Sequence, residues 1–331
     1  MSDIEFAVAR AVGGAIDPDV YLDGLNTCFG HWGDMRQYRW CFERDAGAGT
    51  ADLILATVAD TVVGGSAVVY RTAVSPAGAR VPISIMCGSW TLPAARGKGC
   101  FTGMIEHSLE IGRERGAALL LAFVTEHNPS RRRLEARGST MIPTAYCVAG
   151  AEAETEAARG DGAGPATPSA PASASASDED VTLADIARSR THRFHFGYRD
   201  LDAWRAQHLT RQLPTRTVHL PSGGRALIEE AEDTDRVLAL VASENRLDDL
   251  EDLRRYAATR GRKTFFFTSD ADEIAGAGAR GFRVIPGFLT ALVSDRDGYR
   301  TWLGQAAGRD ADAGPVRESL LPWRLEHGDR M

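Results

Sequence analysis

The sequence lacks the features that mark several protein classes. It has only five cysteines, all in the first half and without Cys-x-x-Cys spacing: Cys28, Cys41, Cys87, Cys100 and Cys147. This argues against a zinc site and a disulfide framework, and indicates reduced, buried thiols in a cytoplasmic protein. No apolar run is long enough to cross a bilayer. Residues 1–5 are acidic and lack the basic and apolar parts of a secretion signal, so we expect neither export nor membrane contact.

The sequence also has fewer basic than acidic residues. The chain has 38 Lys and Arg against 45 Asp and Glu, and its formal net charge is −7. Because nucleic-acid binding needs a basic surface, this balance argues against a nucleic-acid partner and favours a cationic small substrate. The length of 331 residues predicts two domains, and 44% hydrophobic with 25% charged residues is ordinary for a globular protein.

A stretch poor in large apolar side chains divides the chain. Residues 151–180 are rich in Gly, Pro, Ala and Ser and predict a flexible linker between a domain at 1–150 and a domain at 181–305, with a tail at 306–331. Apolar periodicity in the first domain predicts a helix-rich lead over 18–42. It is followed by strands at 53–59, 62–70 and 81–91, a helix at 101–115, a strand at 117–124, a helix at 130–136 and a strand at 141–148.

The second half repeats this order of elements. Its predicted elements are strands at 225–232 and 237–243, a helix at 247–258, a strand at 263–268, a helix at 270–279 and a strand at 283–293. One segment aligns without gaps: Ala-Arg-Gly at 136–138 with Ile-Pro at 142–143 corresponds to Ala-Arg-Gly at 279–281 with Ile-Pro at 285–286. The shared order and this match predict an internal duplication.

The two copies differ at one loop. In the first copy, Arg96-Gly97-Lys98-Gly99 joins a strand to a helix. Such a loop predicts a phosphate site, because glycines let the backbone approach an anion and the first N–H groups of a helix lack partners. The second copy has Glu-Asn-Arg-Leu-Asp-Asp at 244–249, whose carboxylates would repel a pyrophosphate. We therefore expect only the first copy to bind a nucleotide.

This pattern resembles the GCN5-related N-acetyltransferase (GNAT) superfamily. Arg96 and Gly99 match the family loop Arg/Gln-x-x-Gly-x-Gly/Ala, with Phe101 at its last position. Asn128 and Gly138 match the asparagine after the next strand and the glycine after its helix. The resemblance implies an α/β fold of two tandem GNAT-like domains, each a mixed, mostly antiparallel sheet flanked by helices, the second of them degenerate.

The resemblance also implies an acyl-CoA-dependent N-acyltransferase. Acetyl-CoA is the expected donor, a small-molecule amine is the expected acceptor, and direct attack occurs in a ternary complex without a metal. A homodimer is left open. The thioester would lie where two strands splay, near the backbone N–H groups of residues 86–90. The residues implied for CoA binding are Trp90, Thr91, Leu92, Arg96, Gly97, Lys98, Gly99, Cys100, Phe101, Asn128 and Arg132.

The sequence defines the general acid and the general base of the transfer less clearly than the CoA-binding residues. An amine must lose a proton before attack, and the CoA thiolate must be stabilised as it leaves. Glu126 and His127 are candidate bases, with a helix cap or a solvated side chain as the alternatives. Many family members carry a tyrosine acid where this chain has Leu134, so Tyr146 is the substitute candidate, with core packing as the alternative.

Other readings of the same residues also stay open. Asn128 is equally suited to be a helix N-cap, and Arg132 to be part of a solvated face. At the level of the whole protein, two other functions remain: an aminoacyl-tRNA-dependent transferase on the same fold, and a non-catalytic CoA-binding or scaffold protein.

Overall fold

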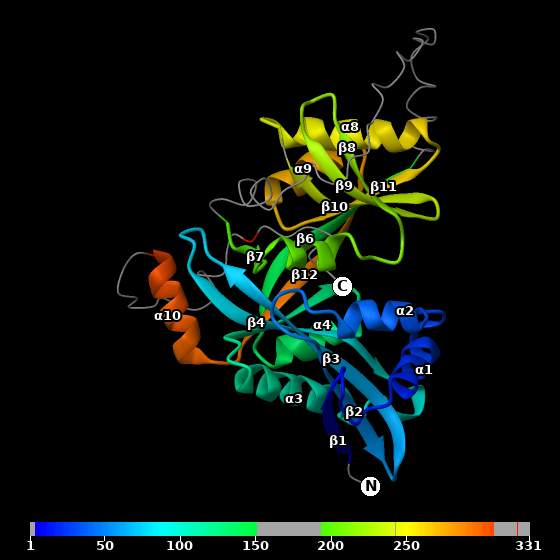
Figure 1. Cartoon of the computed structure of the whole chain (residues 1–331), viewed down its shortest axis with the longest axis vertical. Helices are drawn as coiled ribbons and strands as arrows, with labels where there is room; N and C mark the ends of the chain where they lie inside the picture. The colour runs from blue at the N-terminus through cyan, green and yellow to red at the C-terminus, as the bar shows by residue number, and fades with distance from the viewer. Residues whose placement is uncertain (1–3, 151–192, 242, 308–322, 324–331) are drawn as a thin grey trace.

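The computed structural model describes residues 4–150, 193–241, 243–307 and 323 (Figure 1). The first half contains β1 (Glu5–Arg10), α1 (Pro18–Phe29), α2 (Met35–Tyr38), a π-helical turn (Arg39–Glu43), β2 (Asp52–Val58), β3 (Thr61–Val74), β4 (Arg80–Thr91), a 3-10 turn (Pro93–Ala95), α3 (Cys100–Glu114), β5 (Leu119–Thr125), α4 (Pro129–Ala136) and β6 (Thr140–Ala149). The second half contains β7 (His195–Gly197), α7 (Leu201–His208), β8 (Thr215–His219), β9 (Arg225–Ala231), β10 (Thr234–Val241), α8 (Arg246–Thr259), β11 (Lys263–Thr268), α9 (Ala271–Ala279), β12 (Arg283–Val293) and α10 (Arg296–Ala307).

The predicted order of strands and helices is confirmed, with shifts of a few residues at the ends. The lead over 18–42 is broken into α1, α2 and the π-helical turn, because Gly30 leaves the helical conformation with a φ of 74°. Sequence periodicity missed β1, β7, α7, β8 and α10. The predicted linker at 151–180 lies outside the described residues, as does most of the predicted tail.

A single mixed sheet runs through both halves. Its strand order is β1-β2-β3-β4-β5-β12-β6-β11-β10-β9-β8, and β7 pairs with β3 beside this path. β12 of the second half therefore lies between β5 and β6 of the first, and β6 lies between two second-half strands (Figure 1). Each half thus contributes its last strand to the sheet of the other.

The internal repeat lies at this exchange. Thr140 and Arg283 are equivalent positions of the repeat; Thr140 pairs with Ala291, and Arg283 pairs with Val148. At the centre, Thr144 pairs with Gly287, its own equivalent in the repeat. The two strands are therefore related by a local twofold axis, which is what an internal duplication would leave behind.

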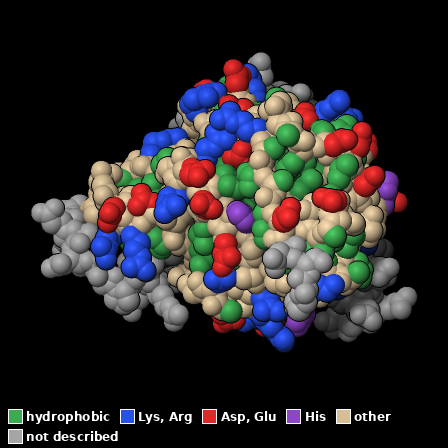
Figure 2. Space-filling model, turned by 90° about the horizontal axis from the view of Figure 1, so that it is seen from below, with side chains coloured by type: hydrophobic (Ala, Val, Ile, Leu, Met, Phe, Trp, Pro, Cys, Tyr) green, Lys and Arg blue, Asp and Glu red, His purple; other side chains and the backbone are tan. Residues whose placement is uncertain are grey.

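Helices cover both faces of the first-half sheet. α1 and α2 pack on one face, over a core that includes Tyr21 and Phe42. α3 packs on the other, over a core that includes Met104 and Ile105, while α8 and α9 cover the second-half strands. Acidic and basic side chains are interspersed on the face shown in Figure 2. None of the described helices combines the length and apolarity needed to span a membrane.

A buried polar contact also joins the halves. The side-chain oxygen of Gln207 on α7 accepts hydrogen bonds at 2.7 Å from both Arg44 and Arg71 of the first half. Arg44 also lies over the ring of Trp40, with its guanidinium carbon 3.8 Å from the ring centre. Burial and the neighbouring Arg71 lower the pKa of Arg44 to about 9. The second half therefore supplies the polar partner that these two arginines share.

Candidate active site

The strands β4 and β5 separate part-way along their length. Their parallel pairing covers Ile83 with Leu119 through Ile85 with Leu121, yet β4 continues to Thr91 and β5 to Thr125. Over that stretch, β5 pairs with β12 on its other side. A gap between neighbouring strands leaves their backbone groups available to a ligand.

A bulge shapes β4 at this gap. The register with β3 shifts between the pairs Ala67–Cys87 and Gly65–Trp90, so Gly88 and Ser89 together oppose Ser66. Gly88 has a φ of 52°, a conformation that glycine adopts without strain. The hydroxyl of Tyr21 on α1 donates to the Gly88 carbonyl at 3.0 Å and holds the bulge against the helix. Bulges of this kind redirect side chains.

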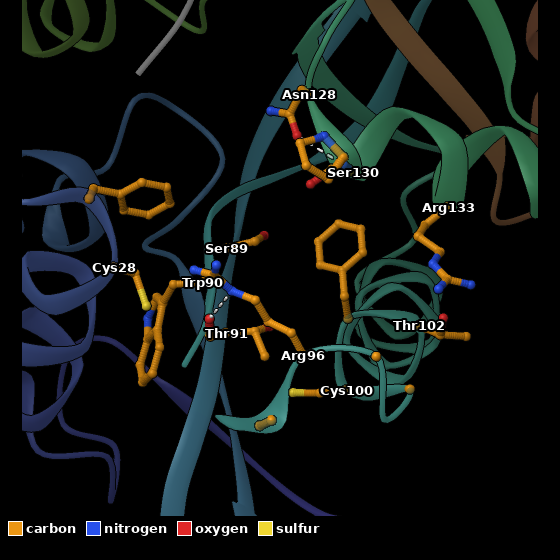
Figure 3. Close-up of a pocket in the computed structure, with 16 residues that line it drawn as sticks. Cys28, Ser89, Trp90, Thr91, Arg96, Cys100, Thr102, Asn128, Ser130 and Arg133 are labelled. Carbon is orange, nitrogen blue, oxygen red and sulfur yellow. Dashed lines mark hydrogen bonds between the residues drawn. The ribbon is translucent and has the colours of Figure 1, made fainter. Parts of the chain in front are cut away.

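A cavity of about 420 Å³ opens beside the bulge (Figure 3). The end of β4, the glycine loop and the N-termini of α3 and α4 form its wall together with the end of α1. Its lining includes eight of the predicted CoA-binding residues: Trp90, Thr91, Arg96, Gly97, Gly99, Cys100, Phe101 and Asn128. These residues, which span positions 90 to 128 of the chain, thus meet around one space.

The glycine loop presents an uncapped helix end to this cavity. Gly97 and Gly99 have φ values of 79° and 92°, and no atom lies within 4 Å of where a Cβ would be. The glycines are therefore required by the backbone conformation. Gly99 is the N-cap of α3 and has no side chain that could accept from the first turn of that helix. These N–H groups and the helix dipole favour an anion.

The equivalent helix of the second half is closed by its own side chains. The side-chain oxygen of Asn245 accepts from the Leu247 N–H at 3.1 Å and caps α8. Asp249 is fully buried and accepts from the Ser243 N–H at 2.8 Å and the Ser222 hydroxyl at 2.5 Å. An internal carboxylate thus lies at the start of α8, whereas the start of α3 faces an open cavity.

Comparisons with known proteins agree with this geometry. Residues 17–133 match the family model described as the acetyltransferase (GNAT) domain. A tandem GNAT protein from the clavulanic acid biosynthesis pathway has a similar structure, with a TM-score of 0.55 and 16% identity over 88% of this chain and 99% of that chain. The N-terminal half carries a GNAT domain, and the whole chain has a tandem GNAT fold.

Two further structures share this fold. A GCN5-related N-acetyltransferase from Anabaena variabilis has a TM-score of 0.57 and 14% identity over 89% of this chain and 74% of its own. The N-myristoyltransferase of Saccharomyces cerevisiae has a TM-score of 0.56 and 11% identity over 88% of this chain and 80% of its own. A sequence search of curated proteins found no match.

Several predicted residues lie outside the main cavity of the GNAT domain. Glu126, His127 and Arg132 line an adjoining recess of about 940 Å³, which shares Asn128 with the cavity. The carboxylate of Glu126 lies 4.0 Å from Arg131. Glu126, His127 and Arg132 therefore lie next to the cavity and not in its lining. Their roles stay predictions.

Three more predicted residues are separate from both spaces. Leu92 donates its N–H to the Val63 carbonyl at 2.9 Å, and Lys98 is exposed on the loop. Tyr146 is buried on β6, with its ring centre 5.2 Å from that of Phe267 on β11. Tyr146 has this second-half neighbour because the two halves exchange strands. Its surroundings are those of a core residue, which was the alternative to its role as an acid.

Asn128 has the predicted role of a helix N-cap, and its contact with CoA stays a prediction. Its side-chain oxygen accepts from the Ser130 N–H at 2.9 Å and caps α4, and it also lines the cavity. The set of residues predicted to bind CoA did not include the rest of the lining, which consists of Cys28, Phe29, Ser89, Ala95, Thr102, Pro129, Ser130 and Arg133. Burial raises the pKa of the Cys28 thiol, although Arg96 opposes the shift. Ser130 and Arg133 follow Asn128 on the same predicted helix, so the sequence contained the information that they lie near it. No feature of the sequence indicated the bulge that exposes Ser89.

Proposed function

We propose that the GNAT domain transfers an acetyl group from acetyl-CoA to a small-molecule amine by direct attack in a ternary complex. The observation that carries this proposal is the uncapped N-terminus of α3 at a cavity that reaches the β4 bulge. The pyrophosphate would bind the first turn of α3 and Arg96. The pantetheine would follow β4 toward the gap where β4 and β5 separate.

The chemistry follows from this placement. The neutral amine attacks the thioester carbonyl carbon, the C–N bond forms, the C–S bond breaks, and CoA leaves as a thiolate. Backbone N–H groups at the β4 bulge would stabilise the oxyanion, as fixed donors do in acyl transfer. Glu126 and His127 remain the candidate bases and Tyr146 the candidate acid. Glutamine, alanine and phenylalanine variants, respectively, test them by their pH–rate profiles.

A pair of variants tests the anion site. Gly97→Asp places a carboxylate at the loop, and Gly97→Asn places a neutral side chain of the same shape there. Both residue types tolerate a positive φ better than others do. Charge repulsion predicts that Gly97→Asp weakens CoA binding at least tenfold, and Gly97→Asn much less. Calorimetric titration with CoA measures this, and equal losses in the two variants would contradict the assignment.

A second experiment tests catalysis. The purified protein is incubated with acetyl-CoA and a library of small amines, and released CoA is measured with a thiol reagent. Amine-dependent release supports the transferase. Binding of acetyl-CoA without release by any amine favours the non-catalytic alternative. A melting temperature unchanged by CoA would contradict CoA binding itself, because a ligand that binds only the folded state raises stability.

A further inference from the structure

The leaving thiolate needs a stabilising group, and the usual position of that group is apolar here. Leu134 on α4 is 2% exposed and packs in the apolar core beneath α3. Of the described side chains that line the cavity, four carry hydroxyls: Ser89, Thr91, Thr102 and Ser130. They differ in which element places them and in what each hydroxyl contacts.

Ser89 has the position closest in structure to the gap. It belongs to the β4 bulge opposite Ser66, and its side chain contacts that of Ser66. Figure 3 shows Ser89 near the middle of the cavity, between Cys28 and α3. Thr102 is on α3 and Ser130 is on α4, both on the side of the cavity away from β4. Ser89 is therefore the hydroxyl next to the expected path of the thioester.

The Ser89 hydroxyl is held by a second, fully buried hydroxyl. The two side-chain oxygens of Ser66 and Ser89 lie 2.8 Å apart, and Ser66 has no exposed surface. Within the described ranges, Ser89 is the sole hydrogen-bond partner of the Ser66 hydroxyl. Either oxygen can be the donor of this bond. When Ser66 donates to Ser89, the Ser89 proton is free to point to the cavity, and this is the arrangement on which the proposal below depends.

A hydrogen bond from Ser66 to Ser89 makes the Ser89 hydroxyl a stronger donor. A hydroxyl that accepts one hydrogen bond becomes more polarised and donates a better one, and the low dielectric of a buried site strengthens the effect. The charged side chains that line the described cavity are Arg96 and Arg133, and its thiols are Cys28 and Cys100. Arg96 hydrogen-bonds the Thr91 carbonyl at 3.2 Å, beyond the bulge along β4. Ser89 is therefore the donor placed at the bulge itself.

We propose that Ser89 donates a hydrogen bond to the sulfur of CoA as the thiolate leaves, and that Ser66 is the positioning residue that orients and polarises it. The proposal rests on the proposed function. As the C–N bond forms, the C–S bond breaks and its electron pair moves to sulfur. The Ser89 hydrogen bond stabilises that charge without transferring its proton. The proton that finally reaches the sulfur comes from the attacking amine.

The pKa of the bound CoA thiol tests this without any acceptor. The intact protein is saturated with CoA, and thiolate absorbance is titrated against pH, with protein lacking CoA subtracted to remove its own thiols. A hydrogen bond to an anion is stronger than one to a neutral group. We expect Ser89→Ala to lower the thiolate-to-thiol ratio at fixed pH about tenfold, and Ser66→Ala a few-fold. Ser89→Thr keeps the hydroxyl and restores most of the ratio.

Ser130→Ala is the matched control, since it removes a hydroxyl from the same cavity on a different element. It leaves the ratio unchanged if the assignment is right. An unchanged ratio in Ser89→Ala that still binds CoA overturns the proposal, as does a larger effect of Ser130→Ala. If Ser89→Ala fails to fold, Ser66→Ala and Ser89→Thr decide the question by the same titration. Failure of the wild-type protein to bind CoA would instead refute the proposed function.

Discussion

Gly24 and Trp90 together offer a sharp test of how the wall of the cavity is built. A Cβ at Gly24 on α1 would lie 2.1 Å from Cζ2 of Trp90, where ordinary contacts are about 3.5–4 Å. The indole has little room to move away, because it also packs against Gly65 of β3, where a Cβ would lie 2.7 Å from its Nε1. In Gly24→Ala, α1 must therefore shift from the sheet by more than about 1 Å.

Two opposing terms set the size of the effect. Alanine is favoured over glycine inside a helix by about 1 kcal/mol. Overpacking a buried contact costs about 1–3 kcal/mol and more where nothing can yield. Because Trp90 is held on both sides, we expect overpacking to win and Gly24→Ala to lower the free energy of unfolding by about 1–2 kcal/mol. Trp90 also lines the cavity, so CoA affinity should fall as well.

Gly278 on α9 provides the matched control. It is also a helical glycine, but a Cβ there would lie 3.8 Å from Val284, an ordinary contact. Gly278→Ala should therefore keep or raise stability, by up to about 1 kcal/mol, and leave CoA binding unchanged. Urea unfolding and CoA titration of both variants measure the difference. A Gly24→Ala protein as stable as the wild type would refute the reasoning that Trp90 is clamped between two glycines.

Other predictions concern ion pairs and pH. Asp52 is buried and accepts a hydrogen bond from Arg115 at 2.9 Å. Asp52→Asn should lower the free energy of unfolding by about 2–3 kcal/mol. This loss is smaller than for a fully buried ion pair, because Arg115 is one-third exposed. Glu106→Gln removes the exposed ion pair between α3 and Arg137 and should lower the free energy of unfolding by less than about 1 kcal/mol. An equal loss in the Asp52 and Glu106 variants would contradict the role of burial. Burial raises the pKa of Cys41 from an ordinary 9 to about 11. Between these values the unfolded thiol loses its proton and the folded one keeps it, so stability falls as pH rises through pH 9–11. Cys41→Ala should reduce that fall by about 2 kcal/mol at pH 11, in denaturation at stepped pH.

The order of elements was predictable because each signal is local. The glycine loop, the apolar run of β5 and the amphipathic pattern of α3 each depend on neighbours within one turn or one strand. The position of Tyr146 was not predictable in this way. An apolar strand pairs equally well with several others, so periodicity could not show that β6 lies between β12 and β11. The bulge at Gly88 was equally hidden, because a single glycine in a strand has several explanations.

The exchange of strands connects the half without a glycine loop to the candidate site. β12 pairs with β5 as far as Thr125, and the N–H of Glu126 donates to the Pro286 carbonyl at 3.2 Å. The loop that leads into Asn128 and α4 is therefore anchored to a strand from the second half. Asp249 meanwhile places its buried side chain at the start of α8, where an anion would otherwise bind. The first half has an open helix end at the cavity, and the second half supports it through the strand that completes its sheet.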